Sequence, residues 1–211
     1  MDALELHRSS VVIDGLVVSR WSREVFEAMH RGGLTAANCT CSVWEGLRDT
    51  MINMARWKQA FVDHADLIMP VRTAHDIRAA KAANRVGILL GWQNSSGLED
   101  RLDFLPLFKD MGLSVIQLTY NTQNLVGSGC WEDRDGGLSG FGKEVVEAMN
   151  RLGILIDLSH VGAKTSSEAI AHSKRPCAYT HVAPYGAFNH PRNKTDEQLR
   201  EIVDRGGFVG V

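Results

Sequence analysis

The feature that most constrains the fold is an alternation of short, β-branched apolar runs with longer segments of helical periodicity. The first run, VVIDGLVV at 11–18, is too short and too rich in valine for a helix. Helical segments carry their apolar residues on one face and several end at a glycine. The pattern predicts strands at 11–18, 34–40, 86–91, 114–119, 154–158, 177–180 and 207–211. It predicts helices at 22–30, 48–64, 99–111, 140–152, 163–173 and 195–204, with a short extended piece at 67–69 and capping boxes at Thr73 and Thr195.

Strands that alternate with helices predict right-handed βαβ units and a parallel sheet with both faces covered. We count about seven main strands, one fewer than a (β/α)₈ TIM barrel needs, and a typical barrel runs to about 250 residues. The chain has 211 residues and ends on the apolar strand residues 208–211. We therefore expect one α/β barrel domain over 1–211, of the metal-dependent hydrolase kind, that lacks its C-terminal part. The alternative is a complete, doubly wound open sheet with a short last edge strand.

The charge balance and the apolar runs exclude several classes of function. Lys and Arg total 23 and Asp and Glu total 25, so the formal net charge is -2. This near balance offers no positive field for a nucleic acid. No apolar run approaches the roughly 20 residues of a membrane span, and the first residues lack a secretory signal, so we expect no membrane partner. Four scattered cysteines do not make a disulfide framework, and we expect a reduced, cytoplasmic protein.

Polar residues follow several of the predicted strands, at the edge where parallel α/β proteins gather their reactive groups. His160 and His181 follow two consecutive strands, and Gln93, Tyr120 and Asn121 follow earlier ones. Because neighbouring barrel strands lie about 4.8 Å apart, two imidazoles at these positions can reach one metal ion. The alternative is that each histidine is a hydrogen-bonded core residue.

Arg192 lies in the loop that follows His181. A planar guanidinium at the mouth of a pocket suits a substrate carboxylate, which it binds bidentately. The alternative is a surface arginine that pairs with Asp196 or Glu197.

Several motifs of this chain share a resemblance to one family. They are GLSGFG at 137–142, NRLGILIDLSH at 150–160, Thr180-His181 and Arg192-Asn193. In these motifs the chain resembles the renal-type membrane dipeptidases, and the match extends over nearly the whole chain. The resemblance implies a (β/α)₈ barrel of the amidohydrolase type that holds two zinc ions and hydrolyses dipeptides with a metal-bridging hydroxide. It also implies that His160 and His181 hold the second zinc and that Arg192 binds the substrate carboxylate.

Four positions depart from the pattern of that family. Where the family carries a His and an Asp that hold the first zinc, this chain has Leu16 and Val18, which cannot bind metal. Gln93 replaces the bridging glutamate and offers a metal only one neutral carbonyl oxygen. Tyr120 replaces a histidine that assists at the substrate. The first zinc site is therefore lost, and we expect one zinc ion, or another divalent metal, rather than two.

These observations predict a metal-dependent hydrolase that cleaves a dipeptide, or a similar small carboxylate-bearing amide, by attack of metal-bound water. The expected site comprises His160, His181 and Gln93 as metal ligands, Tyr120 and Asp157 as catalytic residues, and Arg192, Tyr120 and Asn121 as substrate contacts. Two alternatives remain open. The first is an altered or inactive family member that binds a small acid, and the second is acid–base chemistry of the histidines and Tyr120 without metal. The resemblance also makes a homodimer an expectation.

Overall fold

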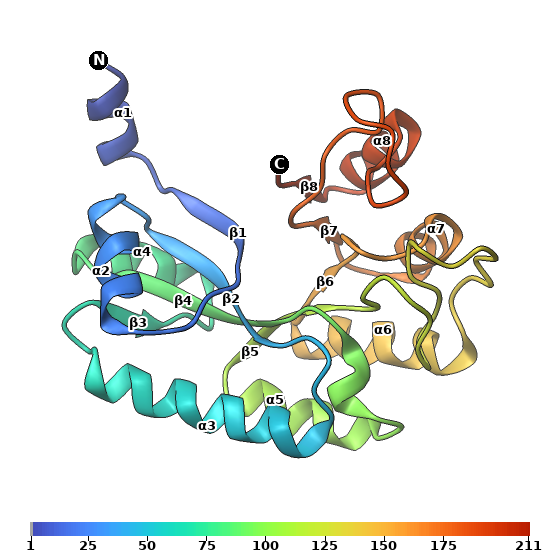
Figure 1. Cartoon of the computed structure of the whole chain (residues 1–211), viewed down its shortest axis with the longest axis horizontal. Helices are drawn as coiled ribbons and strands as arrows, with labels where there is room; N and C mark the ends of the chain where they lie inside the picture. The colour runs from blue at the N-terminus through green and yellow to red at the C-terminus, as the bar shows by residue number, and fades with distance from the viewer. Residues whose placement is uncertain (1) are drawn as a thin grey trace.

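The computed structural model of the chain describes residues 2–211 and shows an α/β fold built on one parallel sheet (Figure 1). The strands are β1 (Ile13–Val17), β2 (Ala36–Ser42), β3 (Ile68–Pro70), β4 (Val86–Trp92), β5 (Leu113–Gln117), β6 (Leu155–Asp157), β7 (Ala178–Tyr179) and β8 (Phe208–Val209). The helices are α1 (Ala3–Ser9), α2 (Arg23–Arg31), α3 (Leu47–Asp63), α4 (Ala74–Ala82), α5 (Leu105–Asp110), α6 (Gly140–Leu152), α7 (Ala163–His172) and α8 (Asp196–Asp204).

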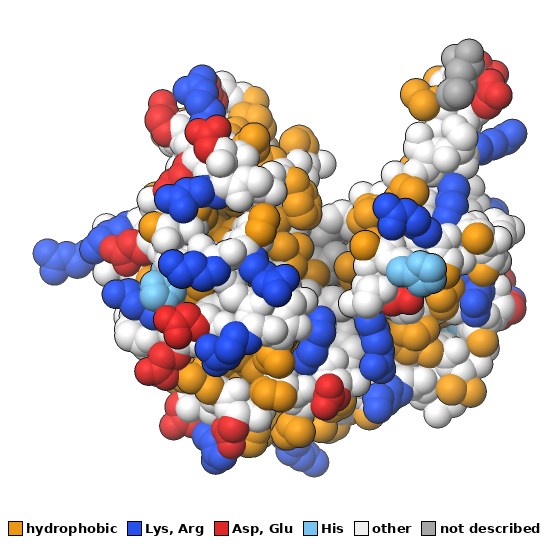
Figure 2. All heavy atoms as spheres, turned by 180° about the vertical axis from the view of Figure 1, so that it is seen from behind, with side chains coloured by type: hydrophobic (Ala, Val, Ile, Leu, Met, Phe, Trp, Pro, Cys, Tyr) orange, Lys and Arg blue, Asp and Glu red, His pale blue; other side chains and the backbone are white. Residues whose placement is uncertain are grey.

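Hydrogen-bonded neighbours in the sheet follow the order β1-β2-β4-β5-β6-β7-β8, and β3 pairs with β4 beside this path. Every pairing is parallel, and Figure 1 shows the sheet curled with the helices on its outer side. The predicted α/β barrel architecture with about seven main parallel strands is therefore confirmed, with the short strand β3 discounted. In the view from behind, the space-filling surface is hollowed between the part that carries α1 and the part that carries α8 (Figure 2).

Local sequence signals account for most of the helix ends. Both predicted capping boxes are present: the Thr73 side chain accepts from Asp76 N, and the Thr195 side chain accepts from Gln198 N. Helix α6 begins after Ser139 and ends at Gly153, whose φ of 64° is the left-handed conformation that glycine adopts without strain. These caps explain why the predicted bounds of the helices at 140–152 and 195–204 lie within a residue of the observed ones.

The prediction of one continuous helix at 99–111 is wrong. The structure instead has two short 3₁₀ helices, Ser95–Leu98 and Leu102–Phe104, followed by the six-residue α5. Pro106 lies in the first turn of α5 and has no N–H for an intrahelical hydrogen bond, so a helix can begin just before it but cannot run through it.

The apolar core lies between the sheet and the helices, and the inner side of the sheet is polar. Along β5 and β6, Ile116 and Ile156 belong to the core cluster, whereas their sequence neighbours Gln117 and Asp157 are buried polar residues. Because successive strand residues point to opposite faces, this alternation separates an outer face that packs on helices from an inner face of polar groups. Within residues 2–211, no helix has the length and apolar character of a membrane span.

Candidate metal centre at the carboxyl ends of β6 and β7

His160 and His181 follow β6 and β7, which are neighbours in the sheet. The structure brings their rings together: Nε2 of His160 lies 3.1 Å from Nε2 of His181. The ring centroids are 5.1 Å apart and the ring planes are inclined by 50°. The two imidazoles therefore converge through the same ring atom of each residue.

The hydrogen bond of the other ring nitrogen fixes the tautomer of His160. Its Nδ1 lies 2.7 Å from Oδ1 of Asn121, which also accepts from the Cys130 thiol at 3.6 Å. An amide oxygen only accepts, so Nδ1 of His160 carries the proton and donates it. Nε2 of a neutral His160 then carries a lone pair. Asn121 makes this contact from a backbone with φ of 61°, a left-handed conformation that is uncommon outside glycine.

A hydroxyl–carboxylate relay fixes the tautomer of His181 in the same way. Thr180 Oγ1 donates to Oδ2 of Asp157 at 2.6 Å and lies 2.8 Å from Nδ1 of His181. Because its one proton goes to the carboxylate, the hydroxyl oxygen accepts from Nδ1–H of His181. The other oxygen of Asp157 accepts from Ser159 N at 3.0 Å and from Ser159 Oγ at 2.5 Å. Nε2 of His181 therefore also carries a lone pair.

Two lone pairs that face each other repel unless a positive group lies between or beside them. Zinc binds imidazole nitrogen at about 2.0–2.1 Å, so two tetrahedral ligands stand roughly 3.3 Å apart, close to the observed 3.1 Å. Metal-bound histidines commonly donate their second N–H to an oxygen, as both do here. The pair fits a divalent metal. In the described part of the chain, no group of three or more His, Cys, Asp and Glu side chains could hold a metal ion, so the remaining ligands would be of another kind.

The surroundings keep both histidines neutral. Burial, and next the positive charge of Arg192, lower the pKa of His160 from 6.5 to about 2. Burial also lowers the pKa of His181 to about 4, although the Asp157 carboxylate acts in the opposite direction. Neutral imidazole is the form that binds a metal, so this environment favours histidines that act as metal ligands over protonated, positively charged imidazolium rings.

Arg192 supports the backbone that carries both histidines. Its Nη1 donates to Ser159 O at 2.8 Å, and its Nη2 donates to His181 O at 2.5 Å. The guanidinium therefore bridges the ends of β6 and β7. Three N–H groups remain after these two bonds, which leaves donors for an anion. No ion pair joins Arg192 to Asp196 or Glu197 within residues 2–211; Asp196 instead lies 4.0 Å from Arg200.

Tyr120 stacks on one histidine of the pair, whereas Gln93 bonds to neither. The Tyr120 ring stacks on His160 at 4.1 Å, with 20° between the planes, and the ring of the exposed Trp44 meets Tyr120 edge-on at 4.8 Å. Gln93 is 4% exposed, and its Nε2 donates to Thr40 Oγ1 at 3.0 Å. No hydrogen bond joins Gln93 to either histidine among the described residues, and its side-chain oxygen makes none.

Sequence reasoning did not identify Ser159 and Thr180 as parts of the site. The available signal is position: each hydroxyl residue immediately precedes a histidine at the end of a strand. Asp157, expected to be catalytic, is 1% exposed and reaches His181 through Thr180. Leu16 lies within β1 and Val18 directly follows that strand, and the Val18 side chain is 64% exposed. Neither side chain offers a ligand atom.

A curled parallel α/β sheet with a histidine pair at the carboxyl ends of its strands defines an α/β-barrel protein with a candidate metal centre. The chain belongs to the membrane dipeptidase family (peptidase family M19), whose family model matches residues 21–211. The resemblance predicted from the sequence motifs is confirmed.

Individual relatives agree with this assignment. The chain is 30% identical over 170 residues to an uncharacterized dipeptidase of Schizosaccharomyces pombe, which covers 78% of this chain and 41% of that protein. It is 55% identical to an amidohydrolase from Pseudomonas aeruginosa of known structure, with a TM-score of 0.98 over 100% of this chain and 65% of the other. A metallopeptidase from Rhodobacter sphaeroides, solved with a phosphinate mimic of the dipeptide L-Ala-D-Ala, shares the fold with a TM-score of 0.87 at 19% identity, over 95% of this chain and 73% of the other. The chain spans less than half the length of the curated fission-yeast dipeptidases it matches.

Proposed function

We propose that this chain carries the metal-binding part of a hydrolase that cleaves a dipeptide or a similar small amide with a free carboxylate. The observation that carries the proposal is the pair of Nε2 atoms, 3.1 Å apart, each left with a lone pair by the hydrogen bond at its Nδ1. Two separate networks set these tautomers, one from Asn121 and one from Thr180 and Asp157. Membership of the dipeptidase family and the likeness to the metallopeptidase structure support the same assignment.

His160 and His181 would hold one divalent metal, with zinc as the first candidate, and the free side-chain oxygen of Gln93 would be a weak third ligand. Such a metal would supply a Lewis acid that polarises the substrate carbonyl and activates water. The residues of the chain would position both the metal and the substrate. Asn121 and Asp157 orient the imidazoles through their Nδ1 atoms and so act as positioning residues. The Tyr120 hydroxyl, which makes no hydrogen bond within residues 2–211, would contact the substrate, and the remaining donors of Arg192 would bind the substrate carboxylate.

The direct test measures metal and activity on the same protein. The chain is dialysed against zinc, its metal content is measured by elemental analysis, and a panel of dipeptides is screened with and without added metal. We expect about one bound zinc per chain, and loss of both zinc and hydrolysis in His160→Ala. His75→Ala, which changes an exposed histidine on α4, is the matched control and should alter neither. Less than about a tenth of an equivalent of zinc, manganese, iron or cobalt in the wild-type protein would contradict the proposal.

A second candidate function is that of an altered family member that binds a small acid without hydrolysing it. The hydrocarbon side chains of Leu16 and Val18, and the engagement of Gln93 with Thr40, favour it. The triple change Leu16→His, Val18→Asp and Gln93→Glu supplies three new ligand atoms, so zinc stoichiometry should rise. Metal-dependent turnover of any dipeptide by the unmodified chain excludes this second function. Hydrolysis that persists in a chelator would instead favour acid–base chemistry by the histidines and Tyr120.

A further inference from the structure

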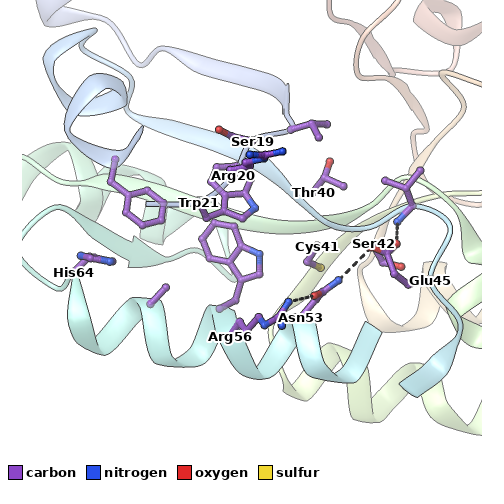
Figure 3. Close-up of a pocket in the computed structure, with 15 residues that line it drawn as sticks. Ser19, Arg20, Trp21, Thr40, Cys41, Ser42, Glu45, Asn53, Arg56 and His64 are labelled. Carbon is purple, nitrogen blue, oxygen red and sulfur yellow. Dashed lines mark hydrogen bonds between the residues drawn. The ribbon is translucent and has the colours of Figure 1, made fainter. Parts of the chain in front are cut away.

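A groove of about 540 Å³ opens beside the end of β2. Its lining comes from the segment that follows β1, from the end of β2 and from α3, and includes Arg20, Trp21, Cys41, Arg56 and Trp57 (Figure 3). None of the residues proposed for the metal centre lines it. The volume is in the range of small-molecule sites, which are about 300–1,000 Å³.

The apolar wall of the groove is aromatic. The rings of Trp21 and Trp57 lie 4.7 Å apart with 55° between their planes, and Trp21 also stacks on Phe26 at 6.1 Å. Trp57 and Phe26 are almost fully buried, so the wall is fixed by the packing of α2 and α3 against the sheet. Because Trp57 is almost fully buried, the half-buried Trp21 supplies the accessible indole face, and such a rigid face suits a flat apolar group at little cost in side-chain entropy.

The charges at the rim are positive and unpaired. Figure 3 shows Arg20 beside Trp21 and Arg56 on α3. Within residues 2–211, neither guanidinium has a carboxylate partner, and the one hydrogen bond of Arg56 is to Asn53 Oδ1 at 3.2 Å. The acidic residue of the lining, Glu45, is occupied by Val43 N at 2.6 Å, Trp44 N at 2.9 Å and the Asn53 amide at 3.3 Å.

We propose that this groove is a second ligand site, which takes a planar apolar anion such as an aromatic carboxylate. The indole wall, which lies between Arg20 and Arg56 in Figure 3, would contact the flat apolar part, and the flanking guanidinium groups would supply the positive charge that attracts the carboxylate. The groove adjoins the histidine pair, because Trp44, next to the lining residues Val43 and Glu45, contacts Tyr120 with its ring, and Thr40 of the lining accepts a hydrogen bond from Gln93. The groove is thus a neighbour of the metal centre that shares none of its proposed residues.

The test is a calorimetric titration of the chain with 2-naphthoate, with 2-naphthylmethanol as the uncharged probe of the same shape. We expect saturable binding of the acid and at least tenfold weaker binding of the alcohol. Arg20→Gln and Arg56→Gln should each weaken the acid about threefold to tenfold, as expected for one charge-assisted contact at a partly exposed site. Arg48→Gln, on the same helix as Arg56 but outside the groove, is the matched control and should bind like the wild type.

Two further variants locate the ligand. Trp21→Ala should weaken the acid about tenfold because it removes half of the indole wall. His160→Ala should leave binding unchanged, since the groove does not include the histidine pair. The proposal is overturned if 2-naphthoate does not bind saturably, if the double change of Arg20 and Arg56 leaves its affinity unaltered, or if His160→Ala abolishes binding. The last result would place the anion at the metal centre.

Discussion

Arg192 offers the sharpest test of how the histidine pair is held together. Its two hydrogen bonds reach carbonyls on different strand ends, Ser159 O at 2.8 Å and His181 O at 2.5 Å. A hydrogen bond from a charged donor contributes about 1.5–3 kcal/mol, so the two together contribute at least about 3 kcal/mol. Water replaces part of this at a half-buried residue, and Arg192→Gln also removes the cost of burying the guanidinium. We therefore expect a loss of about 2 kcal/mol in the free energy of unfolding.

The assay is urea unfolding of the metal-free chain in a chelator, with no substrate present. Arg192→Lys is the informative partner variant, because one ammonium retains the charge but cannot span both carbonyls as the planar fork does. If the two backbone bonds matter, Lys should be nearly as destabilising as Gln, and both should lower zinc affinity about tenfold to a hundredfold by loosening the histidines. Arg200→Gln on α8, an exposed residue, serves as the control. Should both Arg192 variants unfold within about 0.5 kcal/mol of the wild type and bind zinc equally well, Arg192 would serve the substrate alone.

Three other changes test the remaining parts of the argument. Asn121→Gly keeps a residue that tolerates the 61° φ but removes the acceptor for His160 Nδ1. We expect ¹⁵N NMR to show mixed tautomers of that ring, and zinc affinity to fall about tenfold or more. Unchanged ring signals would contradict the tautomer assignment. Both site histidines have pKa values well below 6.5 in the folded chain, so the unfolded chain binds more protons below that pH. The free energy of unfolding of the metal-free chain should therefore fall as pH decreases from about 6.5 towards 4, by up to about 1.4 kcal/mol per pH unit for each histidine. A urea midpoint that stays level across this window would refute the burial argument. Gly15→Ala places a Cβ 2.1 Å from Thr180 O and should destabilise the chain by about 1–3 kcal/mol. The control Gly140→Ala, whose Cβ would have no atom within 4 Å, should be neutral or stabilising. Equal melting temperatures of the two variants would show that β1 does not approach the end of β7 so closely.

Much of the fold follows from local sequence signals. The Thr73 and Thr195 capping boxes and the αL glycine Gly153 fix helix ends through contacts within a few residues, and for that reason they could be predicted from sequence. The apolar spacing at 99–111 predicts one helix, but Pro106 has no N–H to donate, so a helix can begin just before it and cannot continue through it.

In the candidate site, too, some features could be predicted from the sequence and others depend on tertiary contacts. The order of residues by itself shows that His160 and His181 follow successive strands and that Arg192 comes after them, and the family resemblance leads us to expect Leu16 and Val18 at the positions of first-zinc ligands. The sequence could not determine which nitrogen of each imidazole carries the lone pair, or that Arg192 donates hydrogen bonds to backbone carbonyls at the ends of two different strands. Those facts depend on contacts between residues that are 11 to 39 positions apart in sequence, which the curled sheet brings within hydrogen-bond distance. The sequence thus determines which side chains are available to the site, and tertiary packing determines their protonation and their orientation.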